Sequence, residues 1–118
     1  MKHAICTLFE GHYHLGVGAL INSLHAAGYQ GPVICGYRGA EPSWAGAARE
    51  LTGGITVKFV PVATAVHFTY YKPDFMNECW TVHAPDAEQL YYFDPDIVLK
   101  APWNVLARWP FDAQPLGA

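Results

Sequence analysis

The chain has 118 residues and a mass of 13.0 kDa, which leaves room for one domain. Hydrophobic residues make up 52% and charged residues 14%, so the chain can bury a core and lacks the composition of a disordered segment. A net charge of -3 and a pI of about 6.0 argue against a surface that binds nucleic acid. The second half, residues 61–118, holds seven acidic and three basic residues, and these acids require an explanation.

The start of the chain and its cysteines indicate the compartment. The apolar run at residues 4–9 is too short for a secretory signal peptide and ends at Glu10. No stretch reaches about 18 apolar residues, so we expect no membrane span. The three cysteines, Cys6, Cys35 and Cys79, are odd in number and widely spaced, which indicates reduced, buried thiols. Together these features favour a cytoplasmic location.

The first half of the chain alternates short apolar segments with helical patterns. Residues 3–9 form a continuous apolar run, which predicts a buried strand. Apolar residues then recur with a helical period over residues 15–27, and Gly28 is placed to end that helix. A second buried strand is predicted at residues 33–35. A second helix is predicted at residues 42–51, because a proline stands in its first turn and two glycines follow its end.

The second half continues the alternation. Residues 55–62 are rich in β-branched side chains and alternate in polarity, which predicts a third strand. A loop is expected at residues 63–71, and a helix at residues 73–83, which a proline opens. A fourth strand is predicted at residues 89–93, and a short helix at residues 101–109.

Strands that alternate with helices in this way predict an α/β fold, with a mostly parallel, Rossmann-like sheet and helices on both faces. Ligands of such sheets bind beyond the carboxyl ends of the strands. This rule directs attention to four segments: residues 7–13, 36–39, 61–64 and 93–96. The second of them contains Arg38, a candidate contact for a phosphate or a base edge, although an ordinary surface arginine is the default interpretation.

Two carboxylates follow the fourth strand directly, in the segment Tyr92-Phe93-Asp94-Pro95-Asp96. In an extended chain, positions i and i+2 point the same way, so the two aspartates can converge. Converging carboxylates repel each other unless a cation lies between them, and their hard oxygens select Mg²⁺ or Mn²⁺. The alternative is a surface turn in which each aspartate caps backbone amides.

The order of these features resembles a known family. In the segment 7–24, a tyrosine (Tyr13) follows the first strand, Gly16 comes three residues later, and a helix ends in Ser-Leu. With Lys72 ahead of the fourth strand and the Asp-x-Asp motif after it, the chain resembles nucleotide-sugar glycosyltransferases of the GT-A fold, in particular glycogenin and the bacterial lipopolysaccharide glycosyltransferases. The resemblance spans roughly residues 3–109.

This resemblance implies a GT-A type, N-terminal half that binds a nucleoside diphosphate sugar, with a UDP-sugar as the expected donor and Mn²⁺ or Mg²⁺ as the metal. It assigns the surroundings of the base and ribose to four residues: Thr7, Phe9, Glu10 and Tyr13. It also assigns ribose and metal contacts to Asp94, the stronger metal contact to Asp96, and a place near the sugar or phosphates to Lys72. The acceptor and the catalytic group stay unidentified.

The chain also departs from the family. Pro95 stands between the two aspartates, where many members have a small residue, and Glu10 stands where Asp or Asn is frequent. Family members are usually much longer, so we expect residues 1–109 to form an incomplete donor-binding domain and residues 110–118 to be a tail or truncation point. Two alternatives stay open: a sugar-phosphate nucleotidyltransferase, and a non-catalytic α/β binding domain.

Overall fold

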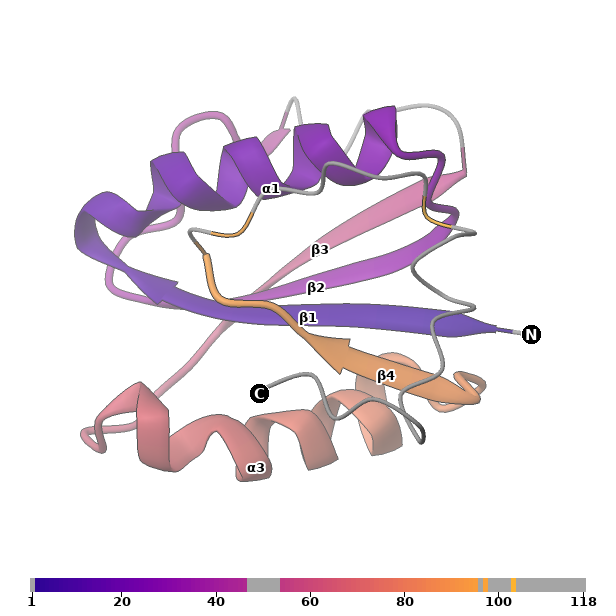
Figure 1. The fold of residues 1–118 in the computed structure, drawn as a ribbon. Helices are drawn as coiled ribbons and strands as arrows, with labels where there is room; N and C mark the ends of the chain where they lie inside the picture. The colour runs from indigo at the N-terminus through magenta and orange to yellow at the C-terminus, as the bar shows by residue number, and fades with distance from the viewer. Residues whose placement is uncertain (1, 47–53, 96, 98–102, 104–118) are drawn as a thin grey trace.

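A computed structural model describes residues 2–46, 54–95, 97 and 103. Within this part of the chain, four parallel strands form one sheet, with a helix on each face (Figure 1). The strands are β1 (His3–Glu10), β2 (Gly31–Arg38), β3 (Ile55–Pro61) and β4 (Gln89–Tyr92). The helices are α1 (His14–Ala26) and α3 (Phe68–Glu78). The predicted α/β fold is therefore confirmed.

The strand order is β3-β2-β1-β4, and every neighbouring pair is parallel. The chain moves outward from β1 through β2 to β3, and then returns to the other side of β1 with β4. β1 is thus an inner strand, in which residues 4–9 are buried. This double-sided burial explains why its sequence is continuously apolar instead of alternating.

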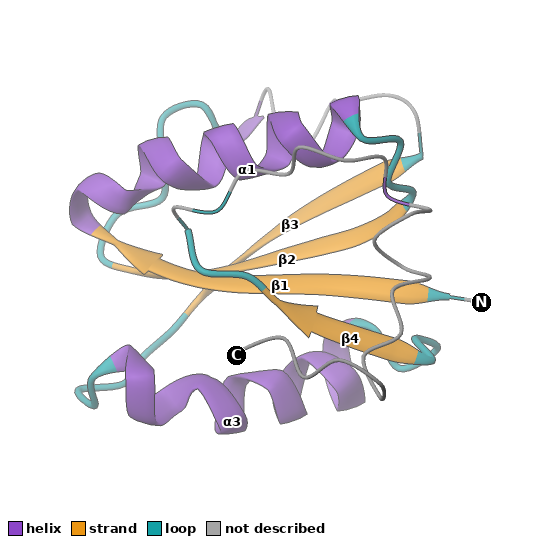
Figure 2. Cartoon of the chain, in the orientation of Figure 1, coloured by secondary structure: helices purple, strands orange, loops and turns teal. Residues whose placement is uncertain are grey.

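The two faces of the sheet carry separate hydrophobic cores. Figure 2 shows the helix that covers each face, with the strands between the two helices. Along β1, Ile5 and Phe9 pack in the core that α1 covers. Cys6 and Leu8 belong to the core that includes Phe75 of α3. The three cysteines are buried free thiols, as predicted.

Helix α1 confirms the predicted period and end. Its apolar stripe buries Leu20 and Leu24 against the sheet. At its C-terminus the backbone N–H of Tyr29 donates to Leu24 and that of Gly28 donates to His25, with N–O distances of 3.0 and 3.2 Å. This pair of bonds is a Schellman motif, and Gly28 has the φ of 83° that the motif requires.

The start of α3 differs from the prediction. The helix begins at Phe68, within the expected loop, and Pro73 lies inside it instead of opening it. His67 provides the N-cap, because its Nδ1 accepts a hydrogen bond from the backbone N–H of Thr69 at 3.1 Å. Pro73 has no N–H to donate to the Thr69 carbonyl, so the helix tolerates a missing bond there. A π-helical turn, Cys79–His83, continues α3 and covers the end of the predicted helix.

Helix α3 approaches the sheet closely at Gly36 of β2. A Cβ atom at this position would lie 2.7 Å from Phe75 Cζ and 2.8 Å from Leu8 Cδ2. Phe75 is fully buried, so its ring has no room to withdraw. The absence of a side chain at residue 36 therefore sets the distance between α3 and the sheet.

Trp103 belongs to the α1-side core and is buried. Its backbone N–H donates to the Ala27 carbonyl at 2.7 Å, and its indole Nε1 donates to His3 Nδ1 at 3.2 Å. Its ring packs edge-on against Tyr29 and Tyr91, with centroid distances of 4.8 and 5.4 Å. Trp103 is therefore a packing residue of this core.

Several predictions fall outside the described residues. Of the helix predicted at residues 42–51, only Ala45 and Gly46 are described as helical. The helix at 101–109, apart from Trp103, and the tail at 110–118 also lie outside, as does the domain boundary at residue 109. Among the residues that are described, no helix has both the length and the apolar character to cross a membrane.

Candidate functional site

A cleft of about 290 Å³ opens at the carboxyl ends of β1, β2 and β4. The chain leaves β1 toward β2 on one side and returns with β4 on the other, so the cleft lies at the topological switch point of the sheet. Ligands of open parallel sheets bind at this place. The volume is at the lower end of the range for small-ligand sites, which is roughly 300–1,000 Å³.

Residues from three separate segments meet in this cleft. The end of β1 and the following turn contribute Phe9, Glu10 and Tyr13, helix α3 contributes Lys72, and the end of β4 contributes Asp94. The sequence singled out all five. Tyr13 is 60% exposed and presents its ring to solvent.

One predicted site residue, Thr7, is not brought to the cleft. Thr7 is fully buried and does not line it. Within the described part of the chain, the Thr7 hydroxyl has no hydrogen-bond partner. The structure thus places Thr7 inside the sheet layer and not at the cleft surface. Asp96, the second predicted metal ligand, lies outside the described residues.

Lys72 and Asp94 form an ion pair across the cleft, with 3.2 Å between Nζ and Oδ1. The Lys72 ammonium also lies 4.7 Å from the centroid of the Tyr92 ring, at cation–π distance. Both charged side chains keep contact with solvent, since 35% of the lysine and 53% of the aspartate side chain is exposed. The pair is therefore accessible to a ligand that competes for either charge.

Glu10 and Arg38 form a second ion pair at the tips of β1 and β2. The two residues are register partners in the parallel ladder, and Arg38 Nε donates to Glu10 Oε2. This hydrogen bond lowers the pKa of the Glu10 carboxyl and raises that of the guanidinium. Glu10 consequently stays an ionised acceptor, and both side chains line the cleft.

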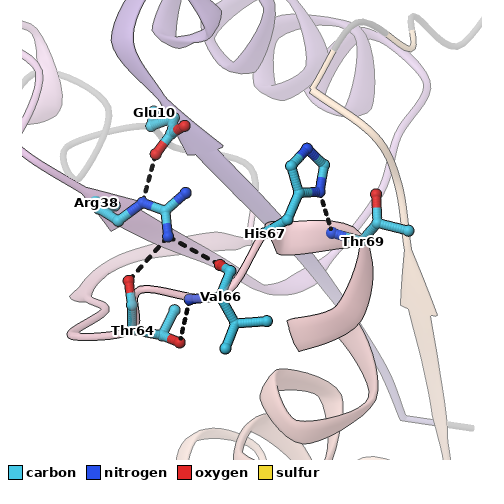
Figure 3. A network of polar contacts seen from close by, with 6 residues as sticks. All are labelled: Glu10, Arg38, Thr64, Val66, His67 and Thr69. Atoms are coloured by element: carbon cyan, nitrogen blue, oxygen red, sulfur yellow. Dashed lines mark hydrogen bonds and ion pairs between the residues drawn. The ribbon is translucent and has the colours of Figure 1, made fainter.

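The same arginine binds the loop between β3 and α3. Arg38 Nη1 donates to the Thr64 carbonyl at 2.8 Å and to the Val66 carbonyl at 2.9 Å (Figure 3). Its guanidinium lies 4.3 Å from the centroid of the Phe68 ring, at the start of α3. Arg38 is therefore a partly exposed arginine that forms part of the wall of the cleft, and its contact with a phosphate or a base edge stays a prediction.

Some lining residues were missed by sequence reasoning. His67 and Thr69 reach the cleft because α3 begins at residue 68 and not at residue 73. The signal for them was the helix cap at His67, which a histidine provides less often than Ser, Thr, Asp or Asn.

The cleft contains the type of side chain that divalent cations prefer as a ligand. Asp94 supplies an exposed carboxylate, which is the ligand type that Mg²⁺ and Mn²⁺ prefer. In the ranges 2–46 and 54–95, with residues 97 and 103, no group of three His, Cys, Asp or Glu side chains could hold a metal ion. The metal role of Asp94 therefore stays a prediction, and the prediction that Asp96 is the second ligand falls on a residue that is not described.

A larger cleft of about 450 Å³ lies at the opposite edge of the sheet, where β1 and β2 begin. Its polar residues include His3, His83 and Asp86. His83 is already bonded on both sides, with Nδ1 2.9 Å from Lys58 Nζ and Nε2 3.1 Å from Glu78 Oε2. We favour the smaller cleft as the functional site, because the amino ends of parallel strands rarely bind ligands.

Comparison with protein-family models and with curated proteins gives no match for this chain. The likeness to GT-A glycosyltransferases therefore stays a prediction that rests on the residues quoted above.

Proposed function

We propose that the cleft binds a nucleoside diphosphate sugar and that the chain is the donor-binding part of a GT-A type glycosyltransferase. One observation carries the proposal. Three features that the sequence singled out separately, namely the turn after β1, the lysine of α3 and the aspartate after β4, line one cleft at the switch point of a parallel sheet.

The side chains suit the parts of such a ligand. The exposed ring of Tyr13 offers a face for stacking a base. The carboxylates of Glu10 and Asp94 accept hydrogen bonds from ribose or sugar hydroxyls. Lys72 and the N-terminal end of α3 both favour a negatively charged diphosphate on the same wall.

The proposed reaction breaks the bond between the anomeric carbon and the diphosphate oxygen, and joins that carbon to an acceptor oxygen. Mn²⁺ or Mg²⁺, held by Asp94 and Asp96, would neutralise charge on the diphosphate leaving group. The task of the described residues is to bind and orient the donor. Lys72 is positioned to pair with phosphate oxygens, and Glu10, kept ionised by Arg38, is positioned to accept from the nucleoside.

A second candidate, a non-catalytic binding domain, is favoured by the Lys72–Asp94 pair itself. Asp94 already has a cation beside it, so the carboxylate does not need a metal for charge compensation. In this alternative the pair is structural, and Mn²⁺ does not change the effect of a nucleotide on the Tm of the chain.

Thermal unfolding with and without ligand tests the proposal. A ligand that binds only the folded state at a hundred times its Kd adds about 2.7 kcal/mol to the free energy of unfolding. We expect UDP or a UDP-sugar with Mn²⁺ to raise Tm, and each alone to raise it less. ADP, GDP and CDP with Mn²⁺ report the base preference.

The matched variants are Asp94→Asn and Asp74→Asn. Asp74 is an exposed carboxylate of α3 that does not line the cleft. The nucleotide-dependent shift should disappear in the first variant and persist in the second. No shift with any nucleoside diphosphate at millimolar concentration, in a chain whose near-UV circular dichroism shows a packed core, would contradict the proposal.

A further inference from the structure

We propose that Arg38 is the positioning residue of this cleft: it holds the loop between β3 and α3 and thereby keeps Lys72 opposite Asp94. Neither the sequence pattern nor the family resemblance gives Arg38 this task. The part of the inference that concerns ligand affinity rests on the proposed function. The part that concerns the loop does not.

The contacts of Arg38 reach three different segments. Nε binds the Glu10 carboxylate at the tip of β1, and Nη1 binds the carbonyls of Thr64 and Val66 in the loop (Figure 3). The flat face of the guanidinium lies against the ring of Phe68, the first residue of α3. One side chain on β2 therefore ties together a neighbouring strand, a loop and a helix.

The loop has additional bonds that lead from Arg38 to the helix. The Val66 N–H donates to Thr64 Oγ1 at 3.1 Å, which folds the loop tightly between its two arginine-bound carbonyls. His67 follows immediately and caps α3 through Thr69. The His67 carbonyl accepts from the N–H groups of Tyr70 and Tyr71 at 2.9 and 3.2 Å. The position of the first helical turn thus depends on where Arg38 holds the loop.

Lys72 lies one turn further along α3, and its ammonium meets Asp94 of another segment. A lysine has four rotatable side-chain bonds, so the Lys72 ammonium meets Asp94 in a narrow set of conformations only while the helix backbone that carries it is held in place. If the loop is released, the first turn of α3 loses its polar attachment to β2 and is held only through packing, such as that of Phe75 further along the helix, so the distance between Lys72 and Asp94 varies more widely. The inference follows from this sequence of contacts.

The chemistry requires arginine at residue 38. A guanidinium has donors in a planar fork, so it can bind a carboxylate and two carbonyls at once while its face packs on a ring. A lysine at the same place has one nitrogen and no flat face. It keeps the charge beside Glu10 but cannot also hold both carbonyls and Phe68 in this arrangement.

Amide hydrogen exchange on the chain without ligand tests the loop part. In Arg38→Ala we expect exchange at Tyr70 and Tyr71 to become at least about tenfold faster, as for the loss of hydrogen bonds to a charged group. The amides of Leu20 and Leu24 in α1 should keep their rates and serve as the internal control. In Arg38→Lys the amides of Tyr70 and Tyr71 should exchange as fast as in Arg38→Ala. Millimolar methylguanidinium should restore slow exchange in Arg38→Ala only.

Unchanged exchange at Tyr70 and Tyr71 in both variants would overturn the inference, as would full protection in Arg38→Lys. If Arg38→Ala fails to fold, Arg38→Lys is measured alone, because it removes the fork and keeps the charge and the aliphatic stem. Accelerated exchange in this variant supports the inference, and wild-type exchange contradicts it.

A double-mutant cycle tests the ligand part. We expect Arg38→Ala to weaken binding of UDP with Mn²⁺ by about tenfold, and Lys72→Gln to add little in the Arg38→Ala background, because Lys72 is already misplaced there. Fully additive losses would contradict a positioning role. If the wild-type chain binds no nucleotide while exchange responds as expected, the proposed function fails and the role of Arg38 in the loop stands.

Discussion

Lys72 Nζ lies 3.2 Å from Asp94 Oδ1, and this contact joins helix α3 to the end of β4 across the mouth of the cleft. The two residues are 22 positions apart in the chain. Lys72 belongs to the helix that covers one face of the sheet, and Asp94 follows the end of a strand. The lysine therefore stands where a second cation would approach Asp94. A divalent metal bound at Asp94, as we propose, would have to share this carboxylate with the Lys72 ammonium or displace it.

Replacing Lys72 by Gln should change metal and nucleotide affinity in opposite directions. Without nucleotide, Mn²⁺ should bind about two- to fivefold more tightly, because an exposed ion pair of this kind is worth roughly 0.2–1 kcal/mol and no longer competes. Nucleoside diphosphates should bind less tightly, because their phosphates lose a cation. Isothermal titration calorimetry measures both, and Lys2→Gln at the opposite edge of the sheet is the control. Equal or weaker Mn²⁺ binding in Lys72→Gln would contradict the competition.

Gly36→Ala should destabilise the fold by about 1–3 kcal/mol, since overpacking forces side chains or backbone to shift. The new methyl group would meet Phe75 and Leu8 at distances below 3 Å. Urea unfolding gives the change in midpoint. Gly46→Ala is the matched control, because a Cβ there meets no atom within 4 Å. Equal midpoints for the wild type and Gly36→Ala would show that α3 can move away from the sheet at no cost.

Thr7→Val should raise the free energy of unfolding by about 1 kcal/mol, because it replaces a buried hydroxyl that lacks a partner among the described residues with a methyl group of similar size. Thr7→Ser keeps the hydroxyl, removes the methyl group and should lower the stability. Chemical unfolding of both variants provides the measurement. A destabilised Thr7→Val would mean that the hydroxyl is bonded in solution.

The stability of the fold should decrease in alkaline solution. Burial raises the pKa of Cys35 from 9.0 to about 12. The pKa of Cys6 is also raised, through a hydrogen bond with Cys79 and through burial. The folded chain keeps protons that the unfolded chain releases above its thiol pKa. This contribution is complete below about pH 9 and is lost as the pH rises toward the raised values.

Urea unfolding at several values between about pH 7 and about pH 10 measures this dependence. The midpoint should stay level up to about pH 8.5 and then fall. A Cys35→Ala variant carries one thiol fewer. Its urea midpoint should therefore fall less steeply with rising pH than that of the wild type, whatever the stability of the variant at neutral pH. A wild-type midpoint that stays level to about pH 10 would contradict the prediction.

The sequence predicted the strands better than their order. Continuous apolar runs mark β1 and β2 because both faces of these strands are buried. β4 is short, but a recognisable Asp-Pro pair follows it after Phe93. The order β3-β2-β1-β4 depends on long-range pairing, which no local pattern encodes. The family resemblance assigns Glu10, Lys72 and Asp94 to one site, and the strand order adds that their common cleft lies at the switch point of the sheet.

The start of α3 shows the other limit of sequence reasoning. Pro73 is a common first residue of helices, so the local rule placed the start there. The helix starts five residues earlier, because His67 caps it and Arg38 holds the carbonyls of the preceding loop. The His67 cap is local, but the bonds from Arg38 come from β2, about 30 residues away in the chain, and local propensity cannot register them.

Trp103 has a consequence for any attempt to shorten the protein. Its indole covers Tyr29 and Tyr91, and its backbone is tied to the end of α1 through Ala27. A fragment cut just after β4 would keep every strand of the described sheet and still expose the aromatic residues beneath Trp103. The smallest recombinant piece that preserves this core must extend through residue 103, and a protease cut between β4 and Trp103 should loosen the α1 face before the α3 face.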